Sequence, residues 1–205
     1  MPRVSEEHLE RRRHQILDAA RACFIRRSIH ETSMQDIFTE SGLSAGAVYR
    51  YFKSKNEIIE AIIATVVDEL YAFLSDLVYT DPVPPLDSLI EAIVERIVVL
   101  AGPEGPARLA PQAWALAMYD SELGHYVQEN FEHVRALLIA YVGRLVEAGR
   151  LPADTDTVAA GKAVFGMMPG CLLQYVLLGD LTPAEITRGM RAIGRETMLT
   201  VHSAT

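Results

Sequence analysis

Small, uncharged residues beside a tyrosine and an arginine form the stretch of this sequence that could read a nucleic acid. The run is SAGAVYR, residues 44–50. Small side chains let a helix enter the major groove of DNA deeply, alanine methyls can contact the thymine methyl, and an arginine can donate two hydrogen bonds to guanine. If Val48 and Phe52 face inward, the outward surface carries Ala45, Gly46, Ala47, Tyr49 and Arg50. This surface indicates base recognition.

Two short helices are needed to position that surface. Ser33 can cap a first helix that ends at Gly42, and Ser44 can cap a second helix that runs to about Phe52. The tight turn between them predicts a helix-turn-helix, with Ile37, Leu43, Val48 and Phe52 on its inner side.

The run GLSAGAVYRYFKSKNEI resembles the signature of the TetR family of transcriptional regulators. The match is carried by the following residues, of which the first three lie upstream: Thr32, Ser33, Ile37, Tyr49, Tyr51, Phe52, Ser54 and Lys55. The sequence departs from the family pattern at Ala47, where Thr is common, at Ser28, where glycine is usual, and at Phe38, where Ala is usual. A left-handed Ser28 would be strained by about 1 kcal/mol.

The resemblance implies an operator of pseudo-palindromic double-stranded DNA that is bound by a homodimer. Phosphate contacts are expected from Thr32, Ser33, Tyr49 and Lys55, and Ser44 and Lys53 also belong to the expected DNA surface. Ala45, Gly46, Ala47 and Arg50 are expected at base edges, with Arg50 either reading a base or holding a phosphate.

The rest of the chain predicts an all-α protein of about nine helices. Ser54 and Glu57 form a capping box that opens a long helix reaching about Tyr79. Proline and glycine breaks then separate further amphipathic helices. We expect a DNA-binding domain over residues 1–55, with three helices, and a ligand-binding and dimerisation domain over residues 56–205.

The last two helices are expected to hold the dimer together. Residues 158–178 are apolar almost throughout, and Thr182 and Glu185 form a capping box for the final helix. An apolar helix of this length also meets the crude threshold for a membrane span. Its internal glycines and Pro169, and the lack of flanking basic residues, favour a second copy of the chain as the cover instead.

Charge is unevenly distributed along the chain. The net charge is −8 overall, but residues 1–55 carry +3 and the remainder −11. A basic head on an acidic body is typical of a DNA-binding regulator. The two cysteines, Cys23 and Cys171, suit buried reduced thiols, and the charged first dozen residues do not resemble a secretory signal, so a cytoplasmic location is expected.

Catalytic and metal-binding patterns are weak. His125, Glu129 and His133 recur every four residues, but their spread around the helix and the lack of a fourth ligand favour exposed polar side chains over a zinc site. We found no phosphate-binding glycine loop and no nucleophile elbow, so neither an enzyme nor a cofactor is expected.

The family resemblance implies a small-molecule effector held in the body. The expected walls of its pocket are Phe131, Phe165, Met168 and Cys171, which would suit an apolar effector, although such residues also build ordinary cores. The expected function is a transcriptional regulator, a repressor released by its effector. The alternative is a helical ligand-binding or enzymatic protein that has lost DNA binding.

Overall fold

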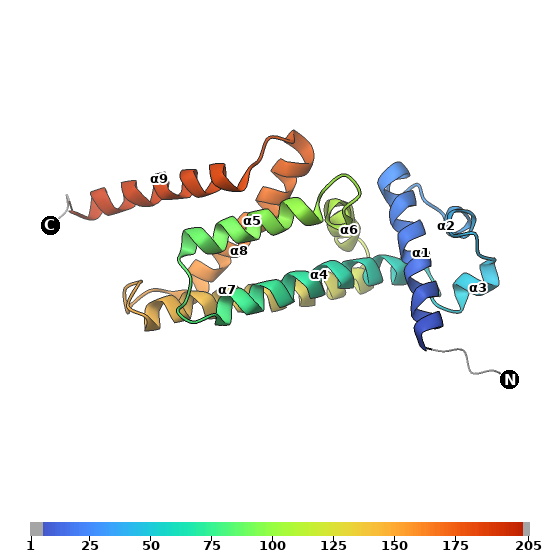
Figure 1. Cartoon of the computed structure of the whole chain (residues 1–205), viewed down its shortest axis with the longest axis horizontal. Coiled ribbons are helices and arrows are strands. Elements are labelled where there is room, and N and C mark those ends of the chain that lie inside the picture. The colour runs from blue at the N-terminus through green and yellow to red at the C-terminus, as the bar shows by residue number, and fades with distance from the viewer. Residues whose placement is uncertain (1–5, 203–205) are drawn as a thin grey trace. The chain divides into compact units, whose positions relative to one another are not determined.

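A computed structural model describes the backbone of residues 6–202 and the side chains of residues 6–194, and this part of the chain is all-α (Figure 1). Nine α-helices and one 3-10 turn follow one another along it: α1 (Glu6–Arg27), α2 (Met34–Ser41), α3 (Ala45–Tyr49), α4 (Lys55–Tyr79), α5 (Leu86–Leu100), η1 (Pro106–Leu109), α6 (Ala110–Ala117), α7 (Ser121–Glu147), α8 (Thr157–Leu178) and α9 (Pro183–His202).

The helices belong to two compact units. The first unit comprises the chain up to Asp68 together with Pro103–Glu129, and the second comprises Glu69–Gly102 together with the chain from Asn130 onward. The long helices α4 and α7 therefore each contribute residues to both units.

In the first unit, local capping signals define α2 and α3. The Ser33 hydroxyl and the Asp36 carboxylate cap each other's backbone N–H groups, and Gly42 ends α2 in the left-handed conformation. The Ser44 side chain accepts a hydrogen bond from the Ala47 N–H at 3.3 Å. These three caps confirm the predicted starts and the predicted turn.

The second helix of the pair is shorter than the sequence predicted. It ends at Tyr49 rather than near Phe52, because the Val48 carbonyl accepts from both Tyr51 and Phe52 N–H groups and the chain then turns. This turn buries the Phe52 side chain, while Leu43, expected inside, is only half-buried.

The opening of α4 differs slightly from the predicted capping box. The Glu57 N–H donates to the Ser54 hydroxyl at 3.2 Å, as expected, but the Glu57 carboxylate accepts from the Lys53 N–H at 2.6 Å and not from Ser54. The predicted end of the helix at Tyr79 is confirmed.

In the second unit, α5 packs against α8 and α9, and Figure 1 shows these helices side by side. One face of α5 is buried, as predicted, through Leu89, Ile90, Ile93, Val94 and Ile97. An ion pair of 2.6 Å joins Arg191 on α9 to Asp87 on α5. The capping box between Thr182 and Glu185 is present at the start of α9.

Helices α7 and α8 approach each other closely at Gly161. A Cβ atom on Gly161 would lie 2.5 Å from the Ile139 Cγ1 atom and 2.8 Å from the Ile139 Cα atom, which is closer than side chains come. The glycine is therefore required by this packing.

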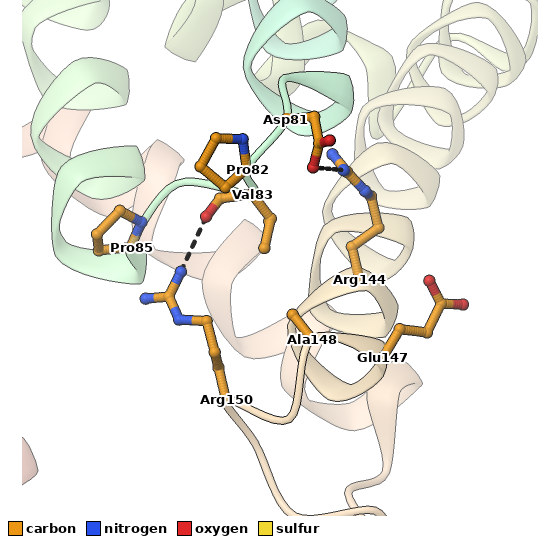
Figure 2. A pocket seen from close by; sticks show the side chains of 8 residues that line it. All are labelled: Asp81, Pro82, Val83, Pro85, Arg144, Glu147, Ala148 and Arg150. Atoms are coloured by element: carbon orange, nitrogen blue, oxygen red, sulfur yellow. Dashed lines mark hydrogen bonds and ion pairs between the residues drawn. The ribbon is translucent and has the colours of Figure 1, made fainter.

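The loop between α4 and α5 is held by side chains from the end of α7 (Figure 2). The Tyr141 hydroxyl donates to the Pro84 carbonyl at 2.8 Å, and Arg150 donates to the Val83 carbonyl at 2.9 Å. Arg144 donates to the Val78 and Thr80 carbonyls. An open hollow lies here, but its arginines already satisfy the carbonyls of the loop and of the end of α4.

Helix α8 has one buried and one exposed side. Gly161, Val164, Met168, Cys171 and Leu172 are buried. Among the described helices, α8 alone is long and apolar enough to cross a membrane by length and composition, with 22% of its most apolar window buried. The exposed side carries Lys162 and Gln174 besides its apolar residues.

Candidate nucleic-acid interface

The outward surface of α3 has the composition that the sequence predicted. Ala45, Gly46 and Arg50 are exposed and Ala47 is half-buried. A Cβ atom on Gly46 would meet no atom of the described structure within 4 Å, so packing within the chain does not require glycine there. This absence of bulk leaves the helix able to approach another surface closely.

Tyr49 and Arg50 flank this surface in different ways. The Tyr49 ring is 42% exposed and meets the Phe38 ring edge to face, with centroids 5.4 Å apart. The contact explains how Phe38 is accommodated where alanine is usual. The Arg50 side chain is exposed and forms no hydrogen bond or ion pair to a described residue. Arg50 is therefore available to an external acceptor.

Thr32 is not on the surface, in contrast to the sequence expectation. It is 1% exposed, and its hydroxyl donates to the Ser28 carbonyl at 2.7 Å. The hydroxyl is thus committed to the turn between α1 and α2. The Thr32 hydroxyl is therefore neither exposed nor free to donate to an external acceptor in this structure.

Ser33 and Ser44 are exposed, and each hydroxyl is a helix cap. Hydrogen bonds from Ser33, followed by the nearby Arg27 guanidinium, lower the pKa of Asp36 below its ordinary value. The start of α2 therefore retains its charged cap under ordinary conditions.

Lys55 is half-buried and braces the turn between α1 and α2. Its Nζ atom donates to the Ile29 carbonyl and to the Thr32 carbonyl, each at 2.9 Å. Burial lowers the pKa of Lys55. An ammonium group has three N–H donors, so these two bonds leave one donor for a further acceptor.

Lys53 is exposed, and its Nζ atom donates to the Tyr49 carbonyl at 2.7 Å. Lys53 therefore lies at the C-terminal end of α3. The structure brings Tyr49, Arg50 and Lys53 together at this end of the helix, and it places Lys55 on the adjoining turn.

Two contacts of the DNA-binding domain were not predicted from the sequence. Gln112 on α6 accepts a hydrogen bond from the Ile29 N–H at 2.8 Å, across 83 residues of chain. The Arg13 guanidinium lies over the Phe52 ring, 5.3 Å from its centroid. No local signal in the sequence marks either pair.

The four predicted pocket residues lie on α7 and α8. The rings of Phe131 and Phe165 meet edge to face at 5.3 Å, and Met168 and Cys171 are buried. Burial raises the pKa of the Cys171 thiol. None of the four lines the hollow beside Arg144 and Arg150.

Of the predicted His125, Glu129 and His133 group on α7, the first two form an ion pair. His125 Nε2 lies 3.2 Å from Glu129 Oε1, with both side chains largely exposed. Over the part of the chain that the structure describes, no three His, Cys, Asp or Glu side chains gather in a group that could hold a metal ion.

Two family models match the chain. The model for bacterial regulatory proteins of the tetR family matches residues 16–62, and the model for the C-terminal part of BetI-type transcriptional repressors matches residues 88–196. YfiR of Bacillus subtilis strain 168, an uncharacterized HTH-type transcriptional regulator, is 29% identical over 191 residues, which is 91% of this chain and 90% of YfiR.

Solved structures show the same fold. GusR of Salmonella enterica superposes with a TM-score of 0.70 at 24% identity, over 92% of this chain and 96% of GusR. SmeT in complex with triclosan superposes with a TM-score of 0.71 at 21% identity, over 87% of this chain and 90% of SmeT. With its helix-turn-helix in α2 and α3 and both family models matched, the chain belongs to the TetR family of transcriptional regulators.

Proposed function

We propose that this regulator binds a pseudo-palindromic operator as a homodimer, with α3 of each protomer in a major groove. The observation that carries the proposal is the slim, uncharged surface of α3, with the exposed Arg50 at its end. Such a surface fits the floor of a major groove, and two-fold symmetry of the dimer would set the spacing of the half-sites.

Base readout is assigned to Ala45, Gly46, Ala47 and Arg50, and phosphate contacts are assigned to Ser33, Ser44, Tyr49, Lys53 and Lys55. The basic balance of the first 55 residues supports these contacts, because an acidic head would be repelled by phosphates. Thr32 supports the turn and is not included, since its hydroxyl is buried and bonded to Ser28.

The dimer is assigned to α8 and α9. Exposed apolar side chains gather on these helices: Val158, Leu173, Leu177, Leu178 and Ile193. Leu177 is 74% exposed and Leu178 is 66% exposed, which is costly for leucine in water. A second copy of the same two helices would cover them.

The regulator acts in the cytoplasm as a repressor that an apolar effector releases. The match to BetI-type repressors and the triclosan bound to the structural relative SmeT support this. An effector that prefers a conformation of the body unsuited to DNA binding would lower the DNA affinity in proportion to that preference.

Selection of bound fragments from random genomic DNA tests the proposal. The purified protein should enrich a pseudo-palindromic sequence, and a gel shift should show preference for it over a scrambled duplex. Enrichment of no sequence at moderate ionic strength would refute sequence-specific binding.

Arg50→Met should reduce that preference by about 1–3 kcal/mol at one position of each half-site, because the bidentate contact to guanine is lost. Arg21→Met is the matched control, since Arg21 on α1 pairs with Asp18 at 2.9 Å. If Arg50→Met weakens binding equally for the operator and for a scrambled duplex, Arg50 contacts a phosphate instead of a base. If it loses no more than Arg21→Met does, Arg50 does not contact DNA.

A further inference from the structure

Arg96 on α5 holds a hydrogen-bond donor that none of the residues with described side chains uses. Its Nε atom is buried and has no hydrogen-bond partner within the described structure. Over residues 6–194, no other buried side-chain nitrogen or oxygen lacks a partner. A buried, unpaired N–H on a charged group is unfavourable, because its hydration has been lost without replacement. The position therefore calls for an acceptor.

The rest of the guanidinium is only partly engaged. Its Nη2 atom donates to the Glu69 carboxylate on α4 at 3.0 Å. Nε–H and Nη2–H lie on the same edge of the guanidinium, and this edge accepts both oxygens of one carboxylate. Glu69 occupies one half of the edge and leaves the other half unfilled.

Glu69 is a weak occupant of that edge. Its side chain is 48% exposed, while that of Arg96 is 31% exposed. Ion pairs with one well-solvated partner contribute little stability, because water competes for the exposed charge. A ligand carboxylate that bonds to both Nε and Nη2 can displace Glu69.

The surroundings of Arg96 suit a ligand that is otherwise apolar. The guanidinium lies over the Phe73 ring of α4, 5.7 Å from its centroid. On α5, Ile93 and Leu100 stand one turn to either side of Arg96, and both are buried. If a ligand carboxylate bound Arg96, the rest of the ligand would therefore lie beside the apolar interior of this unit.

We propose that Arg96 binds the acidic group of the effector, which is an apolar monocarboxylate. When no effector is bound, Glu69 pairs with Arg96 in its place. The inference rests on the proposed function in one respect, that the body binds an effector. It adds the charge of the ligand and the residue that recognises it.

Two matched pairs of probes test acid binding at Arg96 in the full-length protein. Decanoate is compared with decanol, and 4-phenylbutyrate with 4-phenylbutanol, by isothermal titration calorimetry. At least one acid should bind about tenfold more tightly than its alcohol, because the alcohol cannot form the charged bidentate contact. If neither acid binds, or if acids and alcohols bind equally, the inference is overturned.

Variants of the two partners should have opposite effects. Arg96→Met should abolish the preference for the acid, and Glu69→Gln should strengthen acid binding, because the competing carboxylate is removed. Arg191→Gln is the matched control, since it breaks another ion pair between helices of this unit, that with Asp87. If Arg96→Met and Arg191→Gln weaken acid binding equally, or if Glu69→Gln does not strengthen it, Arg96 is a structural residue only.

A gel shift on the selected operator separates this inference from the proposed function. Acid binding that requires Arg96 would support the inference even if the protein showed no sequence preference on DNA. Specific DNA binding without acid binding would support the regulator and overturn the inference.

Discussion

At the scale of single residues, the turn between α1 and α2 shows how one segment collects several roles. Ser28 has a φ of 81°, the left-handed conformation in which the family usually places glycine. Its hydroxyl accepts from the Glu31 N–H at 3.3 Å and its carbonyl accepts from Thr32 at 2.7 Å. These bonds offset part of the strain of about 1 kcal/mol that the serine side chain brings.

Lys55 combines a bracing role in the fold with a proposed contact to a DNA phosphate. Lys55→Met should lower the free energy of unfolding by about 1–3 kcal/mol, because the Ile29 and Thr32 carbonyls lose their partner. It should also lower the salt dependence of DNA binding by about one ion per head, if the third donor meets a phosphate. Urea unfolding and gel shifts at several salt concentrations measure the two effects separately.

Lys53→Met is the control, because the Lys53 side chain is exposed and its Nζ atom donates to the Tyr49 carbonyl and not to the turn between α1 and α2. It should lower the salt dependence while leaving the unfolding free energy within about 0.5 kcal/mol. An unchanged salt dependence in Lys55→Met would restrict Lys55 to its bracing role.

At the scale of helices, packing in the second unit depends on where glycine permits close approach. At Gly161 an added Cβ would meet the backbone of Ile139 on α7, whereas at Gly143 on α7 it would meet nothing within 4 Å. Packing therefore requires glycine at position 161 and does not require it at position 143.

Gly161→Ala should destabilise the protein by about 1–3 kcal/mol, because α7 and α8 must separate to admit the methyl group. Gly143→Ala should be neutral or stabilising by up to about 1 kcal/mol, since alanine favours the helix. Thermal and urea unfolding measure both variants. If the two variants were equally stable, the contact between α7 and α8 would not require glycine at position 161.

At the scale of the whole molecule, α8 and α9 carry large apolar side chains that the described part of a single chain leaves exposed. Isolated exposed leucines are common in soluble proteins, but adjacent ones on one helix indicate an interface. Leu177 and Leu178 are adjacent and largely exposed.

Leu177→Glu should convert the proposed dimer into a monomer and weaken operator binding, because a charge would be buried in the interface and each half-site would then be bound independently. Light scattering coupled to gel filtration should give about twice the 22.7 kDa chain mass for the unmodified protein. Val99→Glu on α5 is the control, because Val99 is 68% exposed and lies outside α8 and α9. If the unmodified protein were a monomer in solution, the proposed dimer interface on α8 and α9 would be refuted.

Local patterns in the sequence were sufficient to predict most of the helices. Ser33, Gly42, Ser44 and Thr182 cap their helices as expected, because a cap depends on residues within one turn. The residues expected on the outer surface of α3 are exposed or half-buried for a similar reason, since helical periodicity places Val48 inside. The sequence alone therefore determined the fold class, the helix pair and the surface on which the family assignment rests.

The tertiary structure decided how distant residues are used. It buried Thr32, committed two donors of Lys55 to carbonyls 26 and 23 residues away, and placed Gln112 against Ile29. It also left the Arg96 Nε atom without a hydrogen-bond partner among residues 6–194. Such outcomes depend on which helices pack together, and residues far apart in the chain carry no local pattern that records that choice.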